Sequence, residues 1–149
     1  MKSIKSIGVF AILLFVAGCE YLPFSFGALD GRPAAPLSDW REIADVDIVQ
    51  FETLREGEAY SVNIWMIAEE THLYVYGGDN EAQWAVNLEA NPQARIQAND
   101  MVYEFSGSRV IDEEEFAHFA QLWLEKYGSD RTDSTASGTF LYRLDPAGA

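Results

Sequence analysis

The sequence predicts an α+β domain in which short antiparallel strands dominate and close into a small barrel. Stretches of alternating apolar and polar residues recur between residues 45 and 144, with short links between them. Only two segments carry helical spacing instead. Many short antiparallel strands favour closure, because a closed sheet leaves no exposed edge.

Three strands are expected first. Residues 45–54 (DVDIVQFETL) mix β-branched and aromatic residues in rough alternation, and REGE then offers a turn. Residues 59–67 place alternate side chains, from Tyr60 to Met66, on one side of a strand. A short strand, LYVY, then ends at two glycines. The short links between the three indicate an antiparallel meander.

A helix of about three turns is expected next, within DNEAQWAVNLEANP. Trp84 and Leu88 lie four residues apart, Asp79 or Asn80 can cap the start, and Pro92 ends the run. The following ARIQA and MVYEFSGSRVI predict a hairpin, because the asparagine–aspartate pair between them tolerates left-handed backbone.

The second helix has the clearest signals. Asp112 and Glu115 form a capping box, and Gly128 provides a C-terminal stop. The face of this helix opposite its apolar stripe carries His118, which we expect to be solvated. We expect the same of His72, which lies in a turn. A last strand, GTFLYRL, follows a polar loop. The helix has one apolar stripe, formed by Phe116, Phe119, Ala120, Trp123 and Tyr127.

The first 19 residues have the order of a bacterial lipoprotein signal. Lys2 and Lys5 precede an apolar run of about ten residues, too short for a membrane span of about 20. The run ends in VAGC, which resembles the lipobox, in which the cysteine receives a diacylglycerol and then further acyl chains. We therefore expect residues 1–18 to be removed and Cys19 to anchor the protein durably in a membrane. The alternatives are an ordinary signal peptide or a buried helix.

This anchor places the protein in the cell envelope. Glu20 follows the cysteine, where an aspartate resembles an inner-membrane retention signal, so the outer membrane is favoured if the host has one. Residues 19–37 are rich in proline and glycine and predict a lipidated, flexible tether, which leaves 38–149 as the barrel domain.

Charge and cysteine content exclude several functions. Loss of Lys2 and Lys5 leaves 8 basic against 24 acidic residues, a formal charge of −16. Such a surface repels phosphate backbones and excludes nucleic-acid binding. With one cysteine, no disulfide within the chain and no multi-cysteine metal site is expected.

The stretch YVYGGDNEAQWAVNLEANPQARIQ resembles the deazaflavin-dependent nitroreductase family. That family belongs to the split β-barrel flavin-binding group, which includes the pyridoxamine-phosphate oxidases. The likeness covers about residues 50–146. It implies a split β-barrel of about six antiparallel strands with two helices, often a homodimer, holding FMN or a deazaflavin in a groove. By this resemblance Gly77 and Gly78 lie near the cofactor, with Trp84 and Asn87 on the next helix. In the structural alternative, the two glycines form a turn, Trp84 is a core tryptophan and Asn87 is a polar helix cap or brace.

Upstream, the chain departs from the family pattern. Family members carry a stretch resembling arginine, lysine, serine and glycine, then a second arginine and a proline, whose cations grip the phosphate. Here Arg55 and Gly57 match the family pattern, but Glu56 replaces a cation. Tyr60 occupies the position of the second arginine, and Asn63 occupies the position of the proline. A phosphate facing two glutamates and one arginine would be poorly held.

Two functions remain open. In the first, the chain is a lipid-anchored flavin or deazaflavin oxidoreductase resembling the nitroreductases. In that case Arg55 binds the phosphate, the glycine pair borders the ring or its tail, and Tyr60 or Tyr103 donates a proton. The pocket would be lined by Tyr60, Asn63 or Trp65. In the second, the barrel is a binding or scaffolding lipoprotein that has lost the cofactor and takes a small apolar ligand, a haem or a protein partner.

Overall fold

The computed structural model describes residues 24–25, 27–131 and 133–148. The predicted signal peptide and Cys19 therefore lie outside the described residues. Within the described ranges no helix is long and apolar enough to cross a membrane. The elements, in chain order, are β1 (Phe24–Ser25), β2 (Arg32–Pro33), the 3-10 helix η1 (Trp40–Ile43), β3 (Ile48–Arg55), β4 (Glu58–Ala68), β5 (Leu73–Tyr76), α1 (Gln83–Ala90), β6 (Gln93–Ala98), β7 (Met101–Arg109), α2 (Glu113–Tyr127) and β8 (Leu141–Pro146).

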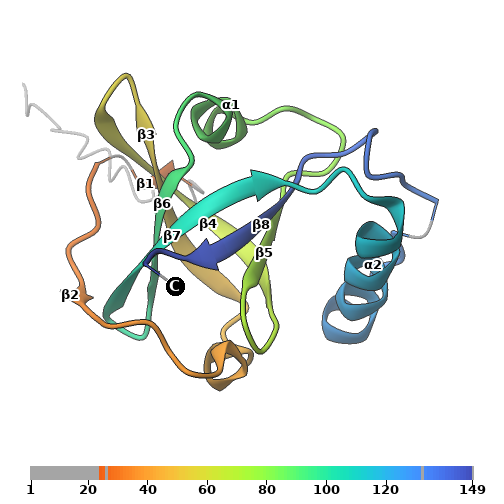
Figure 1. The fold of residues 1–149 in the computed structure, drawn as a ribbon, viewed down its shortest axis with the longest axis horizontal. Helices are drawn as coiled ribbons and strands as arrows, with labels where there is room; N and C mark the ends of the chain where they lie inside the picture. Colours follow the sequence, from red (N-terminus) through yellow and green to blue (C-terminus); the bar gives the residue numbers. More distant parts are fainter. Residues whose placement is uncertain (1–23, 26, 132, 149) are drawn as a thin grey trace, which may run out of the picture.

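Six strands form the predicted antiparallel barrel (Figure 1). Their order is β4-β3-β6-β7-β8-β5, and pairing of β4 with β5 closes the circle. β1 adds to β4 with Phe24 opposite Val62, and β2 lies parallel to β7. The predicted hairpin turn is confirmed, since Asn99 and Asp100 have φ angles of 50° and 63°. The α+β fold class is thus confirmed.

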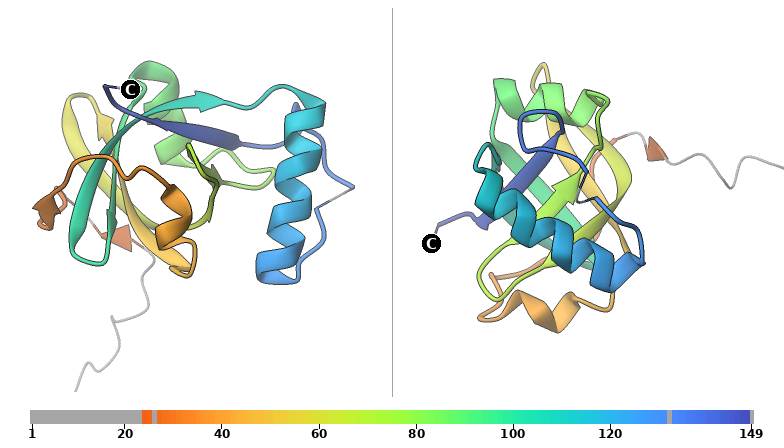
Figure 2. Two further views of the ribbon diagram at one scale, coloured as in Figure 1. Left: turned by 60° about the horizontal axis from the view of Figure 1, so that its bottom comes forward. Right: turned by 90° about the vertical axis from the view of Figure 1, so that its right-hand side faces the viewer.

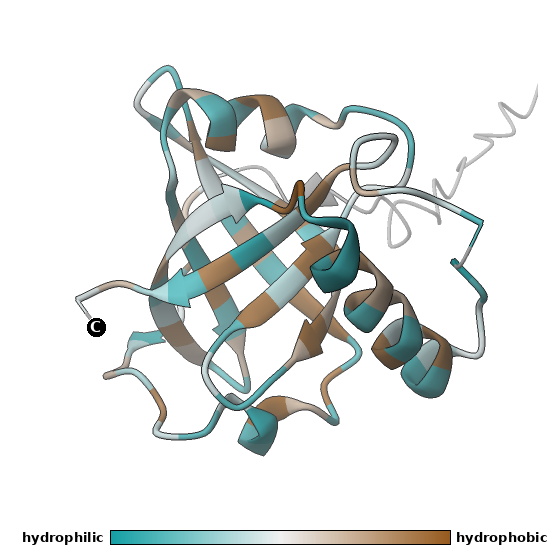
Figure 3. Ribbon diagram, turned by 45° about the vertical axis from the view of Figure 1, so that its right-hand side comes forward, coloured by the Kyte–Doolittle hydropathy of each residue, from teal (hydrophilic) through white to brown (hydrophobic). Residues whose placement is uncertain are grey.

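The barrel interior is apolar, and hydrophobic and hydrophilic residues alternate along its strands (Figure 3). α1 lies over one end of the barrel and η1 over the other (Figure 1). At the α1 end the Trp84 ring meets Phe51 and Tyr142 edge-on, at 5.6 and 5.4 Å. At the η1 end Trp40 contacts Tyr103 at 5.1 Å. Both ends are therefore closed by tryptophans, so the barrel is a packed core and not a channel.

The expectations for α1 were partly wrong. The helix has 8 residues, just over two turns, and its N-cap is Ala82 without a side-chain hydrogen bond. Asp79 and Asn80 do not cap it, because they lie in the turn after Gly78, where Asn80 donates to the Asp79 carboxylate. The apolar spacing was correct, since Trp84 and Leu88 are both buried.

α2 lies across the outer side of the barrel (Figure 2). The predicted apolar stripe forms a second core with Ile67, Tyr74 and Leu141 of the barrel strands. Asp112 accepts from the Glu115 N–H at 2.8 Å, and Gly128 ends the helix at φ 67°, so the N-cap and the C-terminal stop are confirmed. The Glu115 carboxylate accepts from the Tyr74 hydroxyl, so only the Asp112 half of the predicted capping box is observed.

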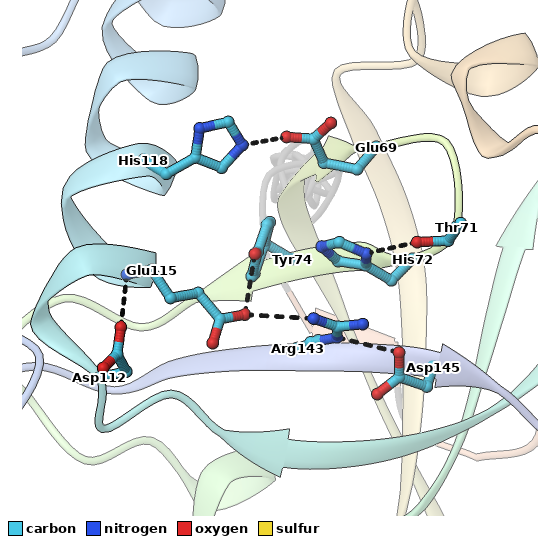
Figure 4. Close-up of polar contacts among 9 residues, drawn as sticks. All are labelled: Glu69, Thr71, His72, Tyr74, Asp112, Glu115, His118, Arg143 and Asp145. Carbon is cyan, nitrogen blue, oxygen red and sulfur yellow. Dashed lines mark hydrogen bonds and ion pairs between the residues drawn. The ribbon is translucent and has the colours of Figure 1, made fainter.

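Polar contacts fix the same helix to the barrel (Figure 4). The Tyr74 hydroxyl donates to the Glu115 carboxylate at 2.9 Å, and burial raises the Tyr74 pKa. His118 is exposed, as expected, but its Nε2 lies 2.5 Å from a Glu69 carboxylate oxygen. The other histidine, His72, is half-buried against the Tyr74 ring, and burial lowers its pKa.

Replacing Asp112 by alanine is expected to lower the free energy of unfolding by about 1 kcal/mol, because the Glu115 N–H then loses its acceptor. Urea denaturation followed by circular dichroism measures the change. Asp112→Asn keeps the cap and should lower the free energy of unfolding by only a few tenths of that amount. Equal losses in the two variants would show that the charge, and not the cap, carries the effect.

The predicted tether over 19–37 is wrong for its described second half. The Leu29 N–H donates to Glu52 Oε2 at 2.8 Å, and the Gly31 N–H to Gln97 Oε1 at 3.2 Å. A Cβ at Gly31 would stand 2.8 Å from the Asp100 carbonyl oxygen, so glycine permits this close approach. Residues 27–37 therefore belong to the domain.

Candidate functional site

A depression of about 360 Å³ lies on the outer side of the barrel, between β4, the turn after β5, and α2. It brings together four residues predicted from the sequence, Asn63, Trp65, Gly77 and Gly78. The complete lining is Asn63, Ile64, Trp65, Tyr76, Gly77, Gly78, Trp123 and Arg131.

The depression exists because β4 and β5 separate. They pair only between Met66–Ala68 and Leu73–Val75. Beyond this point the chain after β5 turns toward β8, where Gly77 and Gly78 exchange backbone hydrogen bonds with Phe140 at 2.9 and 2.8 Å. The outer face of β4 at Asn63 and Trp65 is thereby left uncovered on this side.

The walls of the depression are aromatic. Trp65 points outward from β4 and is 46% exposed. Its ring stacks on Tyr127 of α2 at 5.2 Å and 17°, and it lies 5.9 Å from Trp123. Tyr76 meets Trp123 edge-on at 5.3 Å. Rings held from three elements present a rigid apolar surface of the kind that a planar ligand stacks on.

Two hydrogen-bond donors of the lining lack acceptors. The Trp123 side chain is 2% exposed, and its indole Nε1 has no partner among the described residues; the same holds for Arg131 Nε. The Arg131 guanidinium stands over the Tyr76 and Trp123 rings, at 5.7 and 5.9 Å. A buried donor left unpaired costs about 1–3 kcal/mol. The lining has no carboxylate, so its net charge is positive.

Trp84 and Asn87 are placed elsewhere. Both are buried at the α1 end of the barrel, at 5% and 3% exposure. Asn87 donates to Thr53 Oγ1 and accepts from Gln83, both at 2.9 Å. A Cβ at Gly77 would meet the Trp84 ring at 3.0 Å, so Gly77 also serves this close packing. Their geometry is that of the structural alternatives, a core tryptophan and a polar brace.

Arg55 and Tyr60 lie at a different hollow, of about 310 Å³, at the β3–β4 turn. Glu56 and Glu58 line it as well. Glu56 has φ 52° and Gly57 has φ 85°, so the hairpin turn displays these side chains outward. Two carboxylates and one guanidinium give this hollow a net negative charge. A phosphate group does not fit it.

A third hollow, of about 400 Å³, lies on the outside of β3, β6 and β7. Its central charges are already paired: Glu52 accepts two hydrogen bonds from Arg95, both at 2.7 Å. Tyr103, a proposed proton donor, is 6% exposed inside the barrel and lines neither this hollow nor the depression. Within the described ranges no cluster of three or more metal-ligating side chains is present.

Sequence reasoning missed Tyr76, Trp123 and Arg131 as site residues. The helical stripe that contains Trp123 correctly indicated a packed face. No local pattern shows that this face also ends beside Trp65, which lies 58 positions earlier. Arg131, in a polar loop, carries no spacing signal at all.

No family model and no curated protein matches the chain. Solved structures do match. The heme storage protein HutZ of Vibrio cholerae is 20% identical with a TM-score of 0.59, over 73% of this chain and 88% of that one. An FAD-binding protein of Mesorhizobium loti is 12% identical with a TM-score of 0.54, over 72% and 86%. An F420-H2 dependent reductase is 20% identical with a TM-score of 0.52, over 67% and 95%. At these identities the likeness establishes the shared split-barrel fold.

Proposed function

We propose that this chain is a lipid-anchored envelope protein whose split barrel binds a planar conjugated ligand of the flavin or deazaflavin class. The ring occupies the depression between Trp65 and Gly78. Cys19 carries the lipid, and the outer membrane is the proposed location if the host has one. The homodimer implied by the family resemblance is part of the proposal, and light scattering on the purified protein tests it.

The observation that carries the proposal is the depression with aromatic walls, whose lining also includes Trp123 and Arg131, two residues with a side-chain N–H that has no partner among the described residues. Trp65 offers a face for stacking, and the two donors suit the carbonyl and ring-nitrogen acceptors of a flavin. The volume of about 360 Å³ lies at the lower end of small-molecule sites, enough for a ring system without a long tail. The three solved structures named above are described as storing heme, binding FAD and depending on F420. Each of these three compounds has a planar conjugated ring.

The depression suits the ring of the ligand better than the hollow at the β3–β4 turn suits its phosphate. The hollow where the family resemblance places the phosphate carries Glu56 and Glu58 beside Arg55, and their charge opposes a phosphate. Recognition therefore rests on stacking and on the two donors. A flavin held in this way supplies hydride or electron transfer, and the protein orients the ring and shields one of its faces.

Titration of the mature chain from residue 20 with riboflavin and with FMN tests the proposal. Ring-centred recognition predicts binding of both with dissociation constants within about threefold, or less than 1 kcal/mol. Flavin fluorescence and a shifted absorbance between 350 and 500 nm report binding. A preference of FMN over riboflavin greater than about tenfold would contradict the ring-centred mode.

The second candidate is a binding or scaffolding lipoprotein without a flavin. The two glutamates at the phosphate position favour it, because they are incompatible with the phosphate grip of the flavin enzymes. A colourless protein indifferent to riboflavin, FMN and a deazaflavin would establish this alternative. Reduction of bound flavin followed by its reoxidation with a nitroaromatic compound would instead establish an oxidoreductase.

A further inference from the structure

Two exposed apolar side chains stand together on the face beside the depression. Ile48 is 55% exposed and Trp65 46% exposed. They are cross-strand partners in the β3–β4 register, so their side chains lie next to each other on the outer face of the barrel. Among the described residues, the other large exposed apolar side chains are Val86 in α1 and Ile111 in the segment before α2.

This face is also the one nearest along the chain to the predicted lipid. β1 pairs with β4 so that Phe24 lies opposite Val62, three residues before Trp65 on the same strand. Five residue steps separate Cys19 from Phe24, and a fully extended chain spans at most about 3.6 Å per step, or about 18 Å in all. Trp65 lies about 10 Å further along β4. The anchor therefore holds Trp65 within about 28 Å of Cys19.

We infer that the surface formed by Ile48 and Trp65, the Trp65 face, rests on the head-group region of a zwitterionic membrane. The inference rests on the lipid anchor of the proposed function. Tryptophan suits this position, because its ring is apolar and its N–H remains hydrated. The charges beside the face are Asp47, 72% exposed, Asp45, and Lys126, which lies 3.9 Å from Asp47 and is near both carboxylates, so the face has no excess of positive charge to attract anionic head groups. With 24 acidic residues in the whole chain, an anionic bilayer would be repelled.

The depression shares Trp65 with this face, so its opening would meet the membrane surface. A ring compound dissolved in the bilayer could then enter without passing through bulk water. The proposed site would thereby be loaded from the lipid phase, and apolar planar compounds would be favoured over charged, water-soluble ones.

Tryptophan fluorescence of the full lipidated protein in phosphatidylcholine vesicles tests the inference. The vesicles contain phosphatidylcholine brominated near the head group, which quenches only tryptophans at that depth. The other three tryptophans, Trp40, Trp84 and Trp123, are at most 5% exposed. Quenching is therefore expected in the wild-type protein and should disappear in Trp65→Phe, while Ile111→Ser retains it.

Absence of quenching in the lipidated wild-type protein would overturn the inference, as would equal quenching in Trp65→Phe. Mass spectrometry of the acyl chains verifies the anchor in the same sample, and circular dichroism verifies the fold of each variant. Riboflavin binding in solution needs no membrane. Failure of the membrane contact is therefore distinguishable from failure of the proposed ligand site.

Discussion

Replacing Glu52 by alanine is expected to lower the free energy of unfolding by about 2–4 kcal/mol. Glu52 is 4% exposed and accepts three hydrogen bonds, two from Arg95 at 2.7 Å and one from the Leu29 N–H at 2.8 Å. Breaking one side of a buried ion pair costs about 3–5 kcal/mol. The Arg95 side chain remains 35% exposed, so water offsets part of the loss.

Chemical denaturation of the wild-type protein and of Glu52→Ala measures this effect. Glu104→Ala is the matched control, because Glu104 is an exposed carboxylate on β7, stands opposite Arg95 in the β6–β7 pairing and lines the same hollow. Its loss should stay within about 0.5 kcal/mol. Hydrogen exchange at Leu29 should accelerate in Glu52→Ala alone. Unchanged exchange there would show that the segment over 27–37 is held without Glu52.

The importance of Glu52 could not be inferred from the sequence, whereas the strand that contains it could. Alternation along β3 correctly predicts Val49, Phe51 and Thr53 on the barrel side, because inward-facing residues must be apolar or satisfied. The same alternation places Glu52 outside, where a carboxylate is normally solvated. It is buried because residues 27–37 return over the outer face. A contact between residues 23 positions apart has no local signal.

The second helix shows the opposite case. Its start at Asp112, its stop at Gly128 and its apolar stripe are all local features, and all are confirmed. Short-range rules suffice where capping and periodicity decide the structure. The candidate site combines β4, the turn after β5, α2 and the loop containing Arg131, and only the closure of the barrel brings them together. The glycine pair and Trp65 could therefore be proposed for a site from the sequence, whereas Tyr76 and Trp123 could not.

Two alanine variants distinguish whether the ligand is bound mainly in the depression or mainly at the β3–β4 turn. Trp65→Ala is expected to weaken FMN binding by about tenfold or more, because a stacked aromatic pair contributes about 0.5–1.5 kcal/mol beyond the area it buries. Arg55→Ala is expected to change the affinity less than about twofold, because Arg55 does not line the depression. Fluorescence titration of each variant measures both effects.

Trp65 also stacks on Tyr127 and touches Trp123, so the fold of Trp65→Ala must be checked by its denaturation midpoint. Trp65→Phe provides the graded control, because it keeps an aromatic face of smaller area and should bind with intermediate affinity. Arg131→Ala tests the donor side of the same site without removing a ring. If Arg55→Ala abolished binding while Trp65→Ala bound normally, the turn would hold the ligand through its phosphate, in the manner of the flavin enzymes. The depression would then be a packing defect between β4 and α2 and not a binding site.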